Sequence, residues 1–300
     1  MSALKTLYRG RFAPSPTGPL HLGSLITALA SYLDARHCGG QWLVRMEDLD
    51  PPREEPGAAA SILRSLQCHG LFWDEEVLYQ STRAADYTSA LTTPARDGLL
   101  FSCDCTRAIL APDGACLGHC RARQTDIRGP HALRVAVKRG CQIQFNDLLQ
   151  GPQLSPLGES LPDFVVQRKD GLYAYQLAVV VDDAAQGITH VVRGSDLLDS
   201  TPRQILLQQL LSFQTPHYCH LPVITTHEGQ KFSKQNRAPA LVDDDAAHNL
   251  RCALRFLQQR EPPPALITAE QILAHAIKCW DLSRVPAAMA IPAATIGVDT

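Results

Sequence analysis

Residue types that suit phosphate binding stand near the start of the chain. The stretch 9–23, RGRFAPSPTGPLHLG, places three prolines between Arg11 and the pair His21 and Gly23. Because proline fixes φ and removes a backbone donor, we expect a stiff turn here. Apolar residues at helical spacing over 24–37 predict a helix directly after the turn. The free N–H groups and positive dipole end of that helix would suit a phosphate beside His21 and Gly23.

A second candidate for phosphate binding lies far downstream. The segment EGQKFSKQ, 228–235, is a glycine-containing loop that carries two cations, Lys231 and Lys234. Lysines on such a loop can neutralise the pyrophosphate that leaves a nucleotide. An ordinary solvated turn has the same composition, and a capped helix start explains His21 equally well when each is taken alone. The phosphate hypothesis therefore depends on the two stretches occurring in one chain.

Four of the ten cysteines stand close together and suit a metal ion. They form two pairs around a short loop, Cys103-x-Cys105 and Cys116-x-x-x-Cys120. Four thiolates favour tetrahedral zinc, and a closed set of four protein ligands is typical of a structural site. We predict one structural zinc ion per chain, with His119 as an alternative to Cys116. A set of free thiols is the competing interpretation.

A basic stretch follows these cysteines. Its cations are Arg121, Arg123, Arg128, Arg134, Lys138 and Arg139. Because the stretch adjoins the predicted zinc loop, it would be placed to contact RNA phosphates. The solvated face of a hairpin explains the same residues, and the sequence favours neither interpretation.

The elements that must position these residues follow an α/β pattern. A strand over 4–12, the helix over 24–37 and a second strand within 39–50 form a βαβ unit. Such a unit implies a parallel sheet with a right-handed crossover. Ligands of these sheets bind at the carboxyl ends of the strands. Both the proline-rich turn and the carboxylate cluster that begins at Glu47 are expected at that edge.

The downstream elements continue this pattern with one interruption. Hairpin patterns between 101 and 170 predict an inserted α+β subdomain. The run YAYQLAVVVDD, 173–183, is typical of a buried strand, with Asp182 and Asp183 either shaping its end or capping a helix. We also predict helices over 57–68 and 79–91 and a strand over 188–196. The next helix begins at Ser200 or Thr201 and has Pro202 at its first position. Near the C-terminus we predict a helix over 246–260, a helix capped by Thr268 and Gln271, and a frayed end over 285–300.

Composition narrows the class of protein. The 300 residues carry a formal net charge of −2, which gives no global signal for nucleic-acid binding. The N-terminus lacks the pattern of a signal peptide, and no apolar run reaches membrane-spanning length. Without an export signal, ten cysteines favour thiols or metal ligands over disulfides. We expect a cytoplasmic protein that is a monomer and has no membrane contact.

The motifs together resemble a known family. RFAPSPTGPLHLG and KFSKQ are similar to the HIGH-type and KMSKS-type motifs of class I aminoacyl-tRNA synthetases, in the form that glutamyl-tRNA synthetases use. VRMEDLDP, AYQLAVVVDD, HVVRGSD and STPRQILL resemble the same family in the same order, so the similarity spans about residues 8–240. It implies a Rossmann-like catalytic domain over 1–100 and 171–240, an inserted zinc-binding subdomain over 101–170 and a short C-terminal helical region over 241–300.

The resemblance also implies roles for individual residues. His21, Lys231 and Lys234 would be catalytic, and His21, Gly23 and Lys234 would contact ATP with its Mg²⁺. The positions that would bind L-glutamate are Arg11, Phe12, Ala13, Pro14, Ser15, Glu47, Tyr175 and Arg193. Guanidinium forks suit the two carboxylates of glutamate, and Glu47 suits its ammonium group. Which arginine meets which carboxylate stays open. Ser24 stands where many synthetases have a second histidine, and Phe232 and Gln235 also depart from the usual motif.

The length of the chain narrows the resemblance further. About 65 residues follow Gln235, fewer than a typical domain contains, whereas glutamyl-tRNA synthetases carry a large anticodon-binding region there. This pattern resembles the glutamyl-Q tRNA(Asp) synthetase family. The resemblance implies ATP-dependent activation of glutamate without tRNA, and transfer to the queuosine base of tRNA(Asp). The alternatives are a truncated glutamyl-tRNA synthetase that charges a tRNA 3′ end and an inactive RNA-binding paralogue.

Overall fold

A sheet that is parallel except for its edge strand β7 forms the centre of the protein in the computed structural model, which describes residues 7–112, 114–116, 119–123, 127, 129–226 and 239–296. Its strands are β1 (Arg9–Phe12), β2 (Gln41–Met46), β3 (Leu78–Tyr79), β6 (Ile143–Asp147), β7 (Gly151–Ser155), β9 (His190–Gly194) and β10 (His217–Leu221). Parallel pairs join β1 to β2, β2 to β3, β9 to β10 and β10 to β6. The N–H of Thr189 donates to the carbonyl of Arg9 at 2.9 Å, which places β9 beside β1.

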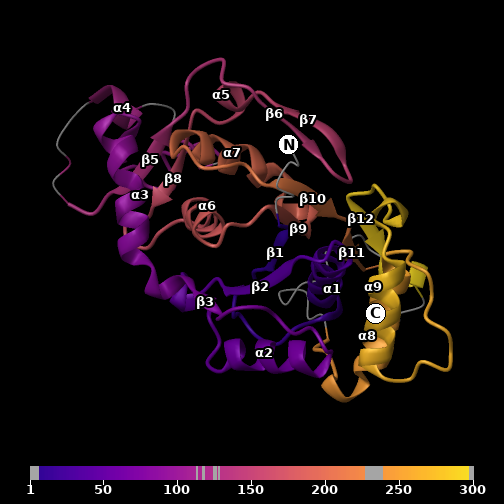
Figure 1. The fold of residues 1–300 in the computed structure, drawn as a ribbon. Coiled ribbons are helices and arrows are strands. Elements are labelled where there is room, and N and C mark those ends of the chain that lie inside the picture. The colour runs from indigo at the N-terminus through magenta and orange to yellow at the C-terminus, as the bar shows by residue number, and fades with distance from the viewer. Residues whose placement is uncertain are drawn as a thin grey trace.

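Helices cover both faces of this sheet (Figure 1). They are α1 (Leu22–His37), α2 (Ala58–Cys68), α3 (Ala84–Arg96), α6 (Tyr175–Ala185), α7 (Thr201–Leu210), α8 (Ala246–Phe256) and α9 (Ala269–Cys279). Successive side chains of a strand point to opposite faces. Accordingly Trp42 and Val44 of β2 pack in the core shared with α1, α8 and α9, whereas Leu43 packs in the core shared with α6 and α7. The predicted βαβ opening and parallel sheet are confirmed.

The segment predicted as an insertion forms two structures. The strands β4 (Leu100–Cys103), β5 (Ala132–Ala136) and β8 (Asp163–Gln167) make an antiparallel sheet, accompanied by the short helices α4 (His119–Arg123) and α5 (Leu157–Ser160). The hairpin of β6 and β7 instead extends the central sheet through β10. The predicted hairpin turn after β8 is present, since the N–H of Arg168 donates to the carbonyl of Leu172 at 2.8 Å and Gly171 has a φ of 85°.

The prediction of a buried strand over 173–183 was wrong. This run forms helix α6, and Asp182 and Asp183 lie within the helix rather than at the end of a strand. The side chains from Leu177 to Asp183 are all buried, because α6 packs against its neighbours on nearly every side. A short helix that is buried all round shows the same continuous apolar run as a central strand, so periodicity does not separate them. The helix predicted over 79–91 also begins later, at Ala84.

The frayed end predicted over 285–300 was wrong for residues 285–296, and residues 297–300 lie outside the described residues. Residues Ala290–Pro292 form strand β12, which pairs in parallel with β11 (Val223–Thr225). Helices α8 and α9 pack against α1 (Figure 1), and the indole N–H of Trp280 donates to the buried carboxyl of Asp34 at 2.9 Å. The capping box predicted at Thr268 is present at the start of α9. Nowhere in the described chain does a helix combine the length and apolar character needed to cross a membrane.

Candidate active site

The proline-rich turn joins the carboxyl end of β1 to the start of α1. The N–H of Glu47, just after β2, donates to the carbonyl of Pro14 at 2.9 Å, so the turn is fixed to the neighbouring strand end. His21 is the N-cap residue of α1, and its Nδ1 accepts a hydrogen bond from the N–H of Ser24 at 3.2 Å. The predicted capping role is therefore present. Contact of His21 with a phosphate stays a prediction.

Gly23 lies where a larger side chain would be crowded. A Cβ atom at this position would come within 3.0 Å of the Ile224 side chain and 3.1 Å of the His21 ring. Ile224 belongs to β11, so the last strand before the predicted lysine loop packs directly on the His21 turn. A side chain at this position would therefore force the Ile224 or His21 side chain to shift by a few tenths of an ångström.

The lysine loop itself, with Lys231 and Lys234, lies outside the described residues. Its two flanks are described, and both reach the His21 turn. On one side is Ile224; on the other, Ala240 forms an antiparallel bridge with His21, and the N–H of Leu241 donates to the carbonyl of Leu20 at 2.9 Å. The chain thus leaves and re-enters the described structure beside the predicted ATP site.

A buried cluster of charges occupies the carboxyl ends of β1 and β2. Asp183 of α6 accepts hydrogen bonds from Arg11 Nε at 3.2 Å and from Arg45 Nη2 at 2.7 Å. Arg45 is fully buried, and its Nη2 also lies 3.8 Å from a carboxylate oxygen of Glu47. Because an unpaired buried charge is costly, the two arginines and two carboxylates neutralise one another. Arg11 donates to Asp183 through Nε, and no hydrogen bond from its terminal nitrogens is seen among the described residues.

The surroundings of Glu47 bring the predicted glutamate-binding residues together. Burial raises the pKa of the Glu47 carboxyl, whereas the positive charges of Arg45, Arg11 and Arg193 lower it, and the result is a pKa of about 7. The charges of Arg193, Glu47 and Arg11 likewise act on the hydroxyl of Tyr175, whose pKa is raised, chiefly by burial. Charged and polar side chains on or next to β1, β2, β9 and α6 therefore interact electrostatically at one edge of the sheet.

Arg193 at the end of β9 has polar partners for all three nitrogens. Its Nη1 donates to the hydroxyl of Tyr175 at 3.3 Å, and its Nη2 donates to the hydroxyl of Thr201 at 2.8 Å. Its Nε donates to His220 of β10 at 3.0 Å. Arg193 as a whole is 4% exposed, so the orientation of its guanidinium is set by these partners.

Sequence reasoning missed several residues that hold this site. Asp183 was expected only to shape a strand end, Arg45 drew no attention, and the pair His220 and Asp147 was not recognised. Asp182 has a separate role, since it accepts hydrogen bonds from Gln80, Arg83 and Tyr87, which join α6 to α3 and the segment before it. A usable signal was present: two carboxylates that follow an apolar run must be paired if that run is buried.

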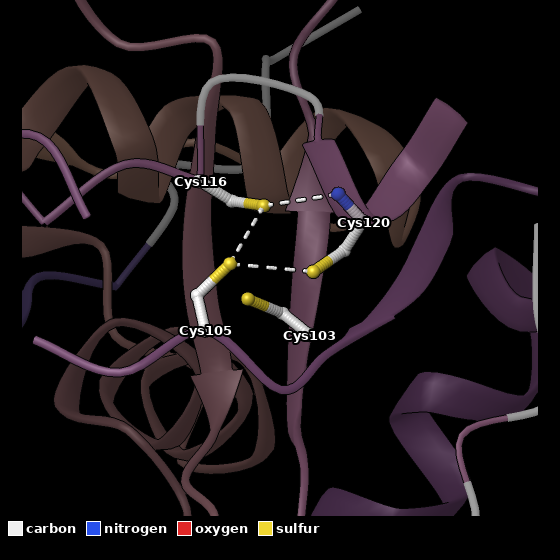
Figure 2. A group of neighbouring side chains, drawn as sticks. All are labelled: Cys103, Cys105, Cys116 and Cys120. Carbon is white, nitrogen blue, oxygen red and sulfur yellow. Dashed lines mark hydrogen bonds between the residues drawn. The ribbon is translucent and has the colours of Figure 1, made fainter. Parts of the chain in front are cut away.

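The four predicted cysteines form one buried cluster (Figure 2). Their sulfur atoms all lie within 4.8 Å of one another, with Sγ distances of 3.8 Å from Cys105 to Cys116 and 3.4 Å from Cys105 to Cys120. Ligands at a Zn–S distance of about 2.3 Å in a tetrahedron are separated by about 3.8 Å, so the cluster fits this ion. All four thiols are free of disulfides. The side chain of His119, the predicted alternative ligand, lies outside the described residues.

The chemistry of the thiols agrees with this fit. Burial raises the pKa of the Cys103 thiol to about 11, so the cluster would keep its protons without a cation. A bound zinc ion would instead deprotonate its thiol ligands. Behind the cluster, the N–H of Cys116 donates to both carboxylate oxygens of Asp163 at 3.0 Å.

One member of the predicted basic stretch has a different role. Arg134 is 2% exposed, and it forms a buried ion pair with Asp163 and a hydrogen bond to the carbonyl of Gly114. It therefore supports the cysteine loop and is unavailable to RNA, which corrects the prediction for this residue. Arg121, Lys138 and Arg139 are exposed, whereas the side chains of Arg123 and Arg128 lie outside the described residues.

Comparison with known proteins agrees with the fold. The family model of class I tRNA synthetases (E and Q), catalytic domain, matches residues 8–114 and 111–257. The glutamate-tRNA synthetase of Elizabethkingia anophelis has a similar structure, with a TM-score of 0.76 and 25% identity over 95% of this chain and 68% of that chain. These findings define a class I tRNA synthetase catalytic domain.

Curated relatives narrow the class. The glutamyl-Q tRNA(Asp) synthetase of Pseudomonas fluorescens is 49% identical over 292 residues, which cover 96% of this chain and 97% of that protein. The protein of the same name from Chromobacterium violaceum is 51% identical over 288 residues, which cover 94% of this chain and 96% of that protein. The chain belongs to the glutamyl-Q tRNA(Asp) synthetase family.

Proposed function

We propose that this protein activates L-glutamate with ATP and transfers the glutamyl group to the queuosine base in the anticodon of tRNA(Asp). The observation that carries the proposal is identity of about half the residues over nearly the whole chain with relatives of that name. The buried charges at the sheet edge support the first step, because their residue types match an amino acid with two carboxylates and an ammonium group. ATP with Mg²⁺, glutamate and the tRNA are the proposed partners, and we expect a monomer.

The first step joins one carboxylate of glutamate to the α-phosphate of ATP. A carboxylate oxygen attacks phosphorus, the bond from the α-phosphate to the bridging oxygen breaks, and pyrophosphate leaves. We propose that the terminal nitrogens of Arg11 and the guanidinium of Arg193 hold the glutamate carboxylates. Glu47 would accept hydrogen bonds from the ammonium group, and the hydroxyls of Tyr175 and Ser15 would complete the pocket. Phe12, Ala13 and Pro14 would form its wall.

The phosphates would lie at the start of α1. His21, Gly23 and the helix N-terminus face this region, and Lys231 and Lys234 would neutralise the charge that develops on pyrophosphate. The flanks of the lysine loop at Ile224 and Ala240 support this arrangement, because both contact the His21 turn. Catalysis would then depend on positioning and cation stabilisation more than on covalent chemistry.

We propose that Cys103, Cys105, Cys116 and Cys120 hold one structural zinc ion. Zinc with four protein ligands has no open position for substrate, so it would stabilise the segment around β4 and β5 and take no part in the reaction. The domain boundaries at 100, 170 and 240 also stay predictions.

The decisive experiment incubates the purified protein with labelled glutamate, ATP and tRNA(Asp) with or without queuosine. We expect label only on the queuosine-containing RNA, and also on an isolated anticodon stem-loop that carries queuosine. Transfer to tRNA(Glu), or to tRNA(Asp) only when its 3′ end is intact, would favour a truncated glutamyl-tRNA synthetase. Absence of glutamate-dependent pyrophosphate exchange without tRNA would favour an inactive RNA-binding paralogue.

A further inference from the structure

Three buried polar residues from adjacent strands form a chain that ends at Arg193. Asp147 of β6, His220 of β10 and Arg193 of β9 are 1%, 0% and 4% exposed. His220 Nδ1 lies 2.6 Å from a carboxylate oxygen of Asp147, and His220 Nε2 lies 3.0 Å from Arg193 Nε. The strand order β6, β10, β9 places the three residues in this sequence. The pairing of these adjacent strands therefore places each side chain within hydrogen-bonding distance of the next.

The arrangement fixes which nitrogen of His220 carries the proton. A guanidinium group can only donate, so His220 Nε2 must accept from Arg193 Nε and cannot be protonated. The proton then lies on Nδ1, which donates to Asp147. Burial also lowers the pKa of the His220 imidazole below its ordinary value, although the hydrogen bond to Asp147 opposes this effect. The pair is thus a neutral histidine beside a carboxylate.

Asp147 is itself held rigidly. One of its carboxylate oxygens accepts hydrogen bonds from the N–H groups of Leu149 at 3.0 Å and Gln150 at 2.8 Å. The same oxygen accepts from the N–H of His220 at 3.2 Å. Burial raises the pKa of this carboxyl, but the hydrogen bonds from His220 and Gln150 outweigh burial and hold the pKa below its ordinary value. The carboxylate therefore offers its remaining oxygen to Nδ1 of His220 in one fixed direction.

We propose that His220 is a positioning residue for glutamate recognition: its Nδ1–H tautomer, selected by Asp147, holds the guanidinium of Arg193 so that Nη1 lies beside Tyr175 at the glutamate pocket. The inference rests on the proposed function, because it takes Arg193 as a ligand of the substrate. It also assigns a role to the β6–β7 hairpin. Asp147 lies within the segment predicted as an insertion, yet it acts on the catalytic site through the central sheet.

Two substitutions separate the hydrogen bond of His220 to Asp147 from its hydrogen bond to Arg193. His220→Asn keeps an N–H near the position of Nδ1 for Asp147 but removes the acceptor for Arg193 Nε. His220→Gln places an amide oxygen near the position of Nε2, where it can accept from Arg193, but it removes the donor to Asp147. In glutamate-dependent pyrophosphate exchange without tRNA, we expect His220→Asn to raise the KM for glutamate about tenfold or more. We expect His220→Gln to raise it about threefold, and the KM for ATP to stay within about twofold of the wild-type value in both.

His69 provides a matched control. It is also fully buried and uses both ring nitrogens, with Nδ1 at 2.7 Å from the carbonyl of Ser65 and Nε2 at 3.0 Å from Asn249, but it lies between α2 and α8. His69→Asn should lower thermal stability without changing the ratio of the two KM values. A selective rise in the glutamate KM for His220→Asn alone would support the positioning role.

Several outcomes would overturn the inference. One is equal glutamate KM values for His220→Asn and His220→Gln; another is an equal rise in the KM for glutamate and ATP. If His220→Asn does not fold, His220→Gln still tests the proposal, since a rise shared by both substrates contradicts it. Arg193→Lys tests whether Arg193 binds glutamate at all. An unchanged glutamate KM in this variant would show that Arg193 is not a substrate ligand and would overturn this inference. Wild-type exchange that does not require glutamate would instead overturn the proposed function.

Discussion

The proposed glutamate pocket and the cysteine cluster are both buried groups of ionisable side chains, but they are stabilised in opposite ways. In the pocket, Arg11 and Arg45 both pair with Asp183, so the chain itself supplies the compensating charge. In the cluster, four thiols face one another with Asp163 and Arg134 behind the loop. Four neutral thiols need no compensating charge, whereas four thiolates would need a cation from outside the protein.

The two regions should therefore respond differently to the loss of a charged side chain or of a metal ion. The charges of the proposed pocket are paired within the protein itself. Removal of one partner should therefore leave a buried charge uncompensated and affect the whole fold. The cluster is a local unit at one end of the molecule, and loss of its metal should affect mainly the segment around β4 and β5.

The largest effect is expected from Asp183→Leu. This change leaves Arg11 and Arg45 without their shared carboxylate in a buried site. We expect the free energy of unfolding to fall by about 3–5 kcal/mol, as measured by urea denaturation. Asp86→Leu is the control, because the Asp86 side chain is 51% exposed and its 3.4 Å pair with Arg83 should contribute less than about 1 kcal/mol. Similar losses for the two variants would show that the pocket is not stabilised by pairing.

Lys234→Ala should separate catalysis from stability. If Lys234 faces the leaving pyrophosphate as proposed, its loss is expected to lower the rate of exchange about 10²- to 10³-fold. The Arg11, Arg45 and Asp183 side chains and the four thiols are unchanged in this variant, so we expect the urea midpoint to stay at the wild-type value. Lys138→Ala, at an exposed lysine just after β5, should leave the exchange rate unchanged. An unchanged rate for Lys234→Ala would contradict the assignment of the lysine loop to ATP.

Removal of the metal should act on the cluster alone. Cys105→Ser is expected to abolish stoichiometric zinc and to speed proteolytic cleavage between residues 100 and 136 about tenfold or more, because local unfolding becomes easier. The KM for glutamate should stay near its wild-type value. Cys252→Ser, at a buried cysteine of α8, is the control for loss of a thiol outside the cluster. Zinc absent from the natively purified wild-type protein would refute the metal assignment.

Sequence patterns predicted the local motifs around the site better than the residues that position the site through tertiary contacts. The turn before α1, the cysteine cluster and the capping box at Thr268 follow from residues close in the chain, so spacing was enough to find them. Asp183 and His220 depend on contacts across more than one element, and their types are compatible with many roles. The strand predicted over 173–183 failed for the same reason, since only tertiary packing shows that helix α6 is buried all round.

The pH dependence of glutamate binding offers the finest test of the pocket. Burial raises the pKa of Glu47 to about 7 despite nearby arginines, and only its ionised form can bind the substrate ammonium group. Between pH 8 and pH 6 the ionised fraction falls about tenfold, so the KM for glutamate should rise by about that factor.

The stability of the fold should respond to pH in the opposite direction to glutamate binding. Because the folded protein binds this proton more tightly than the unfolded chain, the free energy of unfolding should decrease as pH rises from about 4.5 through 7. Glu47→Gln should raise the KM and remove both dependences. A glutamate KM that is flat over this range in the wild-type enzyme would show that the ammonium group is bound elsewhere.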